Sequence, residues 1–139
     1  MFSTVLIAND GSEGAFKALE TAIVLAKEHD AKLHMITVEE MPRFPASIDE
    51  VEEEKDEANH RFAPVLGQAQ AQARQAGVEI ETHLVPGHVA ASIVEFIKQR
   101  QVDLLVVGFM GHSQLYERVI GGTTDRLVRL APCSVLVVK

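Results

Sequence analysis

The segment VDLLVVG, residues 102–108, decides the fold class of this chain. Apart from Asp103 and the terminal glycine, its side chains are apolar at odd and even positions alike, so both faces of a strand formed here must be buried. A strand buried on both faces is typical of the centre of a parallel sheet that carries helices on either side. The segment therefore predicts an α/β domain in which residues 102–108 form a central strand.

Strand-like and helix-like segments alternate on both sides of this segment. The predicted strands are residues 4–9, 32–38, 78–85, 102–108 and 134–138, and the predicted helices are 12–29 with Ser12 as N-cap, 48–75, 88–100 and 123–130. Pro64 is expected to kink or split the second helix, and the alternating pattern of 78–85 is that of an edge strand. The unbroken alternation predicts one three-layer α/β/α domain, residues 1–139, with a five-stranded parallel sheet. The flavodoxin-like order 2-1-3-4-5 and the order 3-2-1-4-5 both fit it.

Composition limits the partners and the compartment of the protein. With 139 residues, 47% of them hydrophobic, the chain can fill one core, and its single cysteine, Cys133, excludes an internal disulfide. The formal net charge of -7 argues against non-specific nucleic-acid binding. Nine of the 20 acidic residues lie between Glu39 and Glu57, and the run at 49–57 is expected to be a solvated helix face. Because the sequence has neither a signal-peptide pattern nor an apolar run of about 20 residues, we expect a soluble, cytoplasmic protein with no membrane partner.

Two turns are expected to meet at the carboxyl edge of the sheet. Open α/β sheets bind ligands there, where the strand order reverses, and in the order 3-2-1-4-5 this point lies between the first and fourth strands. One turn is NDGS, residues 9–12, and the other is GFMGHS, residues 108–113. Asp10 would repel a phosphate, so it suits a ribose, a base or a metal ion carried by a nucleotide. The fingerprints of P-loop NTPases and of Rossmann dinucleotide sites are absent from the sequence.

A glycine-rich loop follows residues 102–108 and leads into the short helix 123–130. Glycines permit positive φ and a close approach of backbone to ligand, and a helix N-terminus offers unpaired N–H groups that suit phosphate. Hydroxyls at the start of the helix add further donors. The loop therefore predicts a polyphosphate site that needs no lysine. Its residues are Gly108, Gly111, Gly121, Gly122, Thr123 and Thr124, with Arg118 and Arg126 nearby in sequence.

These segments resemble the universal stress protein family along nearly the whole chain. The resemblance rests on VLIANDGSEGAFKAL at 5–19, LHMITVEE at 33–40, DLLVVGFMGHS at 103–113 and GGTTDRLVRLAPCSVLVVK at 121–139. The ATP-binding branch of the family carries glycine, two residues, glycine, nine residues, then glycine and a serine or threonine. Gly108, Gly111 and Gly121 keep that spacing. Gly122 departs from it, because the family pattern has a hydroxyl residue at that position.

The resemblance implies a fold, a ligand site and an assembly. The implied fold is the 3-2-1-4-5 sheet of flavodoxin-like and adenine-nucleotide-hydrolase-like proteins, and members of the family are often homodimers that pair through the last strand, here Ser134–Val138. Met41 and Phe44 either cover the adenine pocket or pack at a subunit contact. The implied nucleotide site places Ala8, Asp10 and Val38 near adenine and ribose, and Gly108, Gly111, His112, Ser113, Gly122, Thr123 and Thr124 around the phosphates, with Asn9, Gln114 and Gly121 completing it.

The leading interpretation is a homodimeric, ATP-binding regulatory protein of the stress response, with any Mg²⁺ arriving bound to the nucleotide. Two alternatives stay open. One is a slow ATPase, for which only Asp10, His112 and Arg118 are candidate groups. The other is an interaction module with a degenerate pocket that binds no nucleotide, for which Gly122 is the main argument. The histidines show no metal-binding spacing along the chain, so no metal site made by the protein alone is expected.

Overall fold

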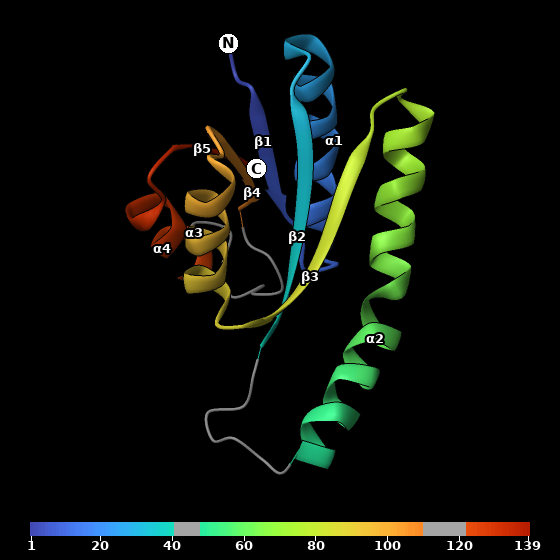
Figure 1. Cartoon of the computed structure of the whole chain (residues 1–139). Coiled ribbons are helices and arrows are strands. Elements are labelled where there is room, and N and C mark those ends of the chain that lie inside the picture. The colour runs from blue at the N-terminus through green and yellow to red at the C-terminus, as the bar shows by residue number, and fades with distance from the viewer. Residues whose placement is uncertain (41–47, 110–121) are drawn as a thin grey trace.

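The computed structural model describes residues 1–40, 48–109 and 122–139, and its fold is α/β (Figure 1). All strands of its five-stranded sheet are parallel, in the order β3-β2-β1-β4-β5. This is the predicted 3-2-1-4-5 order, and it excludes 2-1-3-4-5. In the described ranges the elements alternate as β1 (Thr4–Ala8), α1 (Glu13–His29), β2 (Lys32–Glu40), α2 (Ile48–Gln75), β3 (Ile80–Gly87), α3 (Val89–Arg100), β4 (Leu104–Gly108), α4 (Gly122–Leu130) and β5 (Ser134–Val138).

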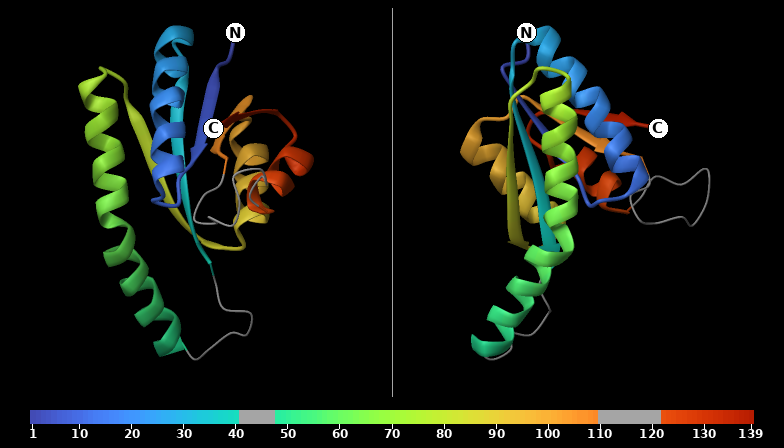
Figure 2. Two further views of the ribbon diagram at one scale, coloured as in Figure 1. Left: turned by 180° about the vertical axis from the view of Figure 1, so that it is seen from behind. Right: turned by 90° about the vertical axis from the view of Figure 1, so that its right-hand side faces the viewer.

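Two hydrophobic cores lie on the two faces of the sheet, and two helices cover each (Figure 2). α1 and α2 cover one face, where Ile7 and Val106 are fully buried. α3 and α4 cover the other face, where Leu6 and Leu105 are fully buried. Because successive side chains of a strand point to opposite faces, the unbroken apolar runs of β1 and β4 supply both cores. The three-layer arrangement is therefore the predicted one.

Asp103, the one charged residue of VDLLVVG, joins the start of β4 to the start of β1. Its carboxylate accepts hydrogen bonds from the N–H groups of Ser3 at 2.8 Å and Thr4 at 3.0 Å. Burial raises the pKa of this carboxyl, but the backbone hydrogen bonds outweigh burial and hold the pKa below its usual value. Asp103 therefore fixes two central strands side by side at the end remote from the predicted ligand site.

α1 begins and ends where the sequence predicts. The Ser12 hydroxyl accepts a hydrogen bond from the Ala15 N–H at 3.1 Å and caps the helix. At the other end Asp30 adopts a left-handed conformation with φ of 52°, and its N–H bonds to the carbonyls of Ala26 and Lys27. The buried face is rich in alanine, which lets the helix approach the sheet closely. It consists of Ala15, Ala18, Leu19, Ala22, Ile23 and Ala26.

α2 runs through Pro64 as one helix, so of the two predicted outcomes, a kink or a split, the split does not occur. The helix instead changes direction part-way along its length (Figure 1), as expected where proline removes an N–H donor and crowds the preceding turn. Its second half packs on the sheet through Ala69 and Ala73, which are fully buried. In its first half Glu52 and Glu57 are exposed, which agrees with the predicted solvated acidic face.

β3 and β5 are the two edge strands of the sheet. The edge position predicted for the third strand is therefore confirmed, although the strand begins at Ile80 and extends to Gly87. β5 pairs with β4 through all five of its residues, from Ser134 opposite Leu104 to Val138 opposite Gly108. Among the described helices, none has the length and apolar character that a membrane crossing requires.

Candidate functional site

A pocket of about 870 Å³ lies at the carboxyl edge of the sheet, around the ends of β1 and β4. These two strands are neighbours, and the chain leaves them toward opposite sides of the sheet, so the pocket occupies the point where the strand order reverses. It is lined by Ala8, Asn9, Asp10, Gly11, Ala15, Ile36, Val38, Glu40, Arg61, Phe62, Val65, Val89, Ile93, Val107, Gly108, Gly122, Thr123, Thr124 and Leu127.

The turn after β1 is fixed by its own side chains. Asn9 is buried; its amide oxygen accepts the Gly11 N–H at 2.9 Å, and its amide nitrogen lies 3.5 Å from the Met35 sulfur. The Asp10 carboxylate accepts the Ser12 N–H at 3.0 Å. Gly11 has φ of +87°, a conformation that favours glycine. The turn therefore holds the exposed Asp10 at the pocket, and Asp10 serves both the turn and the pocket wall.

Gly108 ends β4 beside the first turn of α1. A Cβ atom at this position would lie 2.9 Å from both the carbonyl carbon and the carbonyl oxygen of Gly14. The sequence predicted that this glycine serves positive φ or a close approach to ligand. Its φ lies outside the left-handed region, and its close approach is to the α1 backbone. Gly108 thus brings β4 and the N-terminus of α1 together at the pocket.

Thr124 fastens the first turn of α4 to the end of β4. Its hydroxyl is buried and donates a hydrogen bond to the Gly108 carbonyl at 2.8 Å. Thr124 lines the pocket as predicted, but its hydroxyl proton is already engaged by the backbone. We therefore regard Thr124 as a positioning residue for the helix start.

The N-terminus of α4 opens on the same pocket. Gly122 is the first helical residue, one position earlier than predicted, and Gly122 and Thr123 are both exposed and line the pocket. A Cβ atom at Gly122 would meet no atom of the described residues within 4 Å. The first N–H groups of a helix have no partner within the helix and carry a partial positive charge. This end of the pocket is therefore suited to an anion.

Eight predicted site residues meet at this pocket, and five fall outside the described residues. The pocket is lined by Ala8, Asn9, Asp10, Val38, Gly108, Gly122, Thr123 and Thr124. The predictions for Gly111, His112, Ser113, Gln114 and Gly121, and those for Met41, Phe44 and Arg118, lie outside the described residues. Arg126 is exposed on α4 and is not among the lining residues.

Sequence reasoning missed the contribution of α2 to the pocket. Arg61, Phe62 and Val65 line it, and the Arg61 guanidinium lies 4.7 Å from the centre of the Phe62 ring. Arg61 brings a cation and Phe62 an aromatic face to a pocket whose eight predicted and described lining residues supply neither. The spacing of Phe62 and Val65 places them on one side of a helix, but only the tertiary structure shows that this side faces the pocket.

The pocket combines an apolar wall with a polar rim. Val38, Val89 and Ile93 belong to the wall, whereas Asp10, Glu40 and Arg61 carry its charges. Among its described lining residues there is no histidine, lysine or cysteine. The arrangement suits a ligand with a flat apolar part and an anionic part, and these residues supply no nucleophile with an adjacent base.

An open parallel sheet with a ligand-sized pocket at its point of reversal defines an α/β domain of the class that binds small molecules beyond its strand ends. The chain belongs to the universal stress protein family, because the sequence profile of that family matches residues 1–139. It is 32% identical over 151 aligned residues to universal stress protein YxiE of Bacillus subtilis strain 168, with 100% of both chains covered.

Two solved structures of the family share the fold. Universal stress protein UspA from Lactobacillus plantarum superposes with a TM-score of 0.88 at 26% identity, covering 99% of this chain and 98% of that one. A universal stress protein in complex with cAMP superposes with a TM-score of 0.78 at 28% identity, covering 99% of this chain and 97% of that one.

Proposed function

We propose that this chain is an adenine-nucleotide-binding regulatory protein of the stress response, and that ATP is its nucleotide. One observation carries the proposal: the pocket at the β1–β4 reversal ends at the N-terminus of α4. The loop with the Gly108, Gly111 and Gly121 spacing leads to that helix end. The complex of a related universal stress protein with cAMP supports the ligand class, because cAMP is itself an adenine nucleotide.

The adenine ring fits the apolar part of the pocket. Val38 at the end of β2 and Ala8 at the end of β1 offer flat, apolar contacts on adjacent strands. Asp10, held by its turn, is the acceptor for a ribose hydroxyl. The Asp10 carboxylate also favours a sugar over a phosphate at this end of the pocket, because a carboxylate and a phosphate repel each other.

The phosphates then extend toward the N-terminus of α4. The N–H groups of Gly122 and Thr123 and the Thr123 hydroxyl are their donors in this proposal. Arg61 supplies the positive charge from α2. Gly111, His112, Ser113, Gln114 and Gly121 complete the phosphate site, and Mg²⁺ enters with the nucleotide, near Asp10.

Binding, rather than turnover, is the function that these groups favour. Phosphoryl transfer needs a positioned water or base and a means to neutralise the charge that develops. The described lining residues offer Arg61 for the charge, but Asp10 is the one candidate base on the β1 side and is bonded to its own turn. We expect at most slow hydrolysis.

β5 is the proposed dimer contact. It is an edge strand with the apolar sequence VLVV at 135–138, and its residues from Val135 to Val138 are only half-buried. An edge strand offers unpaired backbone groups to a second copy of the chain. Sedimentation at several protein concentrations tests this part, and a chain that stays monomeric throughout would remove it. A cytoplasmic location goes with the proposed role.

Calorimetric titration of the ligand-stripped protein with ATP tests the nucleotide proposal. We expect micromolar binding. We expect Val38→Glu to abolish it, because a carboxylate would then replace the apolar contact with adenine, in a pocket that already carries the Asp10 carboxylate. Val24→Glu makes the same change on α1 at a side chain that is 53% exposed and away from the pocket, so it should bind as the unaltered chain does. Folded protein that binds no adenine nucleotide would favour the interaction-module alternative and overturn the proposal.

A further inference from the structure

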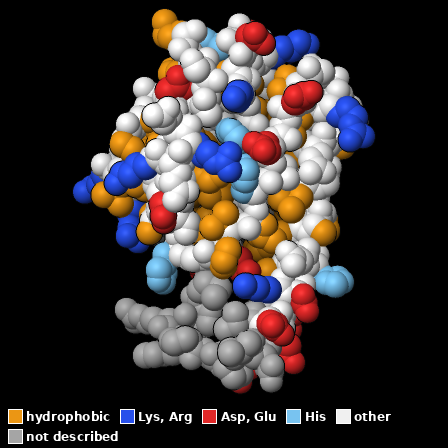
Figure 3. Space-filling model, in the orientation of Figure 1, with side chains coloured by type: hydrophobic (Ala, Val, Ile, Leu, Met, Phe, Trp, Pro, Cys, Tyr) orange, Lys and Arg blue, Asp and Glu red, His pale blue; other side chains and the backbone are white. Residues whose placement is uncertain are grey.

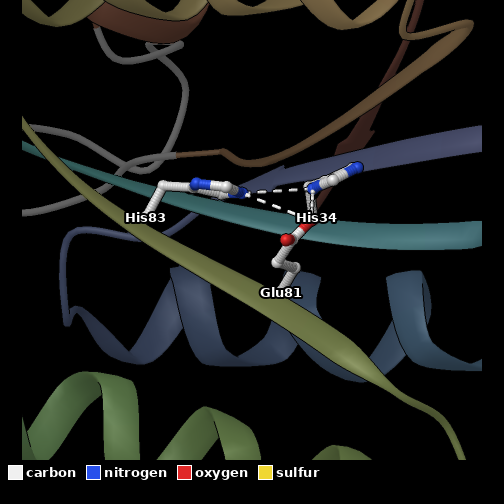
Figure 4. A group of neighbouring side chains, drawn as sticks. All are labelled: His34, Glu81 and His83. Carbon is white, nitrogen blue, oxygen red and sulfur yellow. Dashed lines mark hydrogen bonds and ion pairs between the residues drawn. The ribbon is translucent and has the colours of Figure 1, made fainter.

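Three side chains of metal-ligating type meet on the sheet, outside the nucleotide pocket (Figure 4). His34 lies on β2 and is paired in register with Glu81 on β3. Glu81 and His83 are two residues apart on one strand, so their side chains point to the same face of the sheet. The spacing of the histidines along the chain predicted no protein metal site, but this cluster forms across two paired strands.

The three ligand atoms have the spacing of a zinc site. His34 Nδ1 lies 3.1 Å from His83 Nε2 and 3.1 Å from Glu81 Oε2, and His83 Nε2 lies 4.0 Å from Glu81 Oε2. Three atoms with these separations lie on a circle whose radius is about 2.0 Å, which matches the usual Zn–N and Zn–O distances of about 2.0–2.2 Å. A zinc ion at its centre would lie in the plane of the three atoms, so tetrahedral coordination requires the exposed Glu81 side chain to bring its oxygen closer to His83 Nε2.

Neutral imidazole is the form that binds metal ions. Without a metal, the contact between His34 Nδ1 and His83 Nε2 needs a proton on one nitrogen and a lone pair on the other. A bound metal ion would take both lone pairs instead.

The cluster is rigid on one side and open on the other. Phe96 of α3 packs against both imidazoles, with ring centroids 5.6 Å from His34 and 4.8 Å from His83. The Glu81 side chain is 64% exposed, and it shares with His34 an open hollow lined also by Arg100. Figure 3 shows histidine, acidic and basic side chains gathered on this face of the molecule. A metal ion therefore has access from solvent, and water can supply a fourth ligand.

We propose that His34, Glu81 and His83 bind a zinc-class divalent cation that clamps the edge strand β3 to β2. Two imidazoles and one carboxylate suit Zn²⁺ and its late first-row neighbours, whereas Mg²⁺ and Ca²⁺ prefer sites made of oxygen ligands. Three protein ligands and one open position is also a common zinc coordination. None of the three residues is among the described residues that line the proposed nucleotide pocket, so the two sites share no described side chain.

Two neighbouring cations set the strength of the site. Arg100 and Lys32 line the same open hollow as His34 and Glu81. Their positive charges would oppose a divalent cation bound there. We therefore expect Arg100→Gln to tighten zinc binding, an effect that a purely structural role for the cluster would not produce.

Calorimetric titration of the untagged, chelator-stripped chain with ZnCl₂ tests the proposal. We expect one Zn²⁺ per chain, a higher thermal unfolding temperature with Zn²⁺ and not with Mg²⁺, and visible bands typical of tetrahedral coordination with Co²⁺. Glu81→Gln and His83→Gln should each weaken the affinity by at least about tenfold. His60→Gln, which alters an exposed histidine on α2, is the matched control and should leave the affinity unchanged.

Two results would overturn the proposal. One is the absence of stoichiometric zinc binding by the folded chain. The other is binding that survives in Glu81→Gln and His83→Gln, because the metal would then be held by other residues. Glu81 is exposed and Gln keeps its shape, so Glu81→Gln should remain folded, and circular dichroism verifies this before the titration.

Discussion

Gly122→Ser restores the hydroxyl that the family motif carries and that this chain lacks, and it should strengthen ATP binding. The described residues leave room for it: none of their atoms lies within 4 Å of a Cβ atom at Gly122, and this residue is helical. The hydroxyl would stand at the first residue of α4, beside the proposed phosphates. A hydrogen bond to a charged acceptor is worth about 1.5 kcal/mol or more, and a neutral one about 1 kcal/mol. For this exposed position we expect about 1–1.5 kcal/mol, which lowers the Kd for ATP about five- to twelvefold.

Gly122→Ala is the matched control, because it adds the same Cβ atom without the hydroxyl. Both substitutions replace a helical glycine and should stabilise the fold by similar amounts, up to about 1 kcal/mol. Calorimetry with ATP and with adenosine separates the two effects. We expect the gain only for Gly122→Ser and only with ATP, since adenosine has no phosphate. Equal affinities of the two variants for ATP, or an equal gain for adenosine, would refute the placement of the phosphates at α4.

Three further predictions concern the framework that positions the pocket. Gly108→Ala should lower the free energy of unfolding in urea by about 1–3 kcal/mol, because its Cβ would lie 2.9 Å from the Gly14 backbone. Gly14→Ala should cause no loss, because its Cβ meets no atom of the described part of the chain within 4 Å. A similar loss in both variants would contradict the packing described. Thr124→Val should lower the free energy of unfolding by about 1–3 kcal/mol, because the buried Gly108 carbonyl would lose its 2.8 Å hydrogen bond. Thr124→Ser keeps the hydroxyl and should keep most of the stability. Equal losses in the two variants would exclude the hydroxyl as the cause. The folded state lowers the pKa of Asp103 from its unfolded value of 3.8, so the ionised carboxylate stabilises the fold at pH values above 3.8. This stabilisation is lost as the pH falls through the lower pKa of the folded state. The stability difference between the unaltered chain and Asp103→Asn should therefore shrink in acid, and a pH-independent difference would contradict the prediction.

The fold was largely predictable because its determinants are local. The apolar runs of β1 and β4 and the Ser12 cap of α1 identify elements without reference to neighbours. Local sequence patterns do not determine the order of the strands in the sheet. The strand pattern allowed two orders, and the resemblance to a family selected the correct one. The sequence predicted either a kink or a split at Pro64, and the structure has the kink, because α2 changes direction but continues as one helix.

The candidate site was predictable only in part, because several of its features depend on contacts between distant segments. Nothing in the sequence around Gly108 reveals that its missing side chain makes room for the α1 backbone. The hydrogen bond from Thr124 to Gly108 spans 16 residues, and the contribution of Arg61 depends on the path of α2. His34 is separated from His83 by 49 residues, and only strand pairing brings their rings together. The Glu81-x-His83 spacing on a strand was the one local signal of that cluster.

The central claim is that an adenine nucleotide binds where β1 and β4 end. Titration of the isotope-labelled chain with ATP, followed through its backbone amide NMR signals, tests it most directly. We expect saturable shifts at Asp10, Val38, Gly108 and Thr123, with little change at His34 and Glu81 of the proposed zinc site. Unchanged spectra at millimolar ATP, or shifts confined to residues outside the pocket, would contradict it.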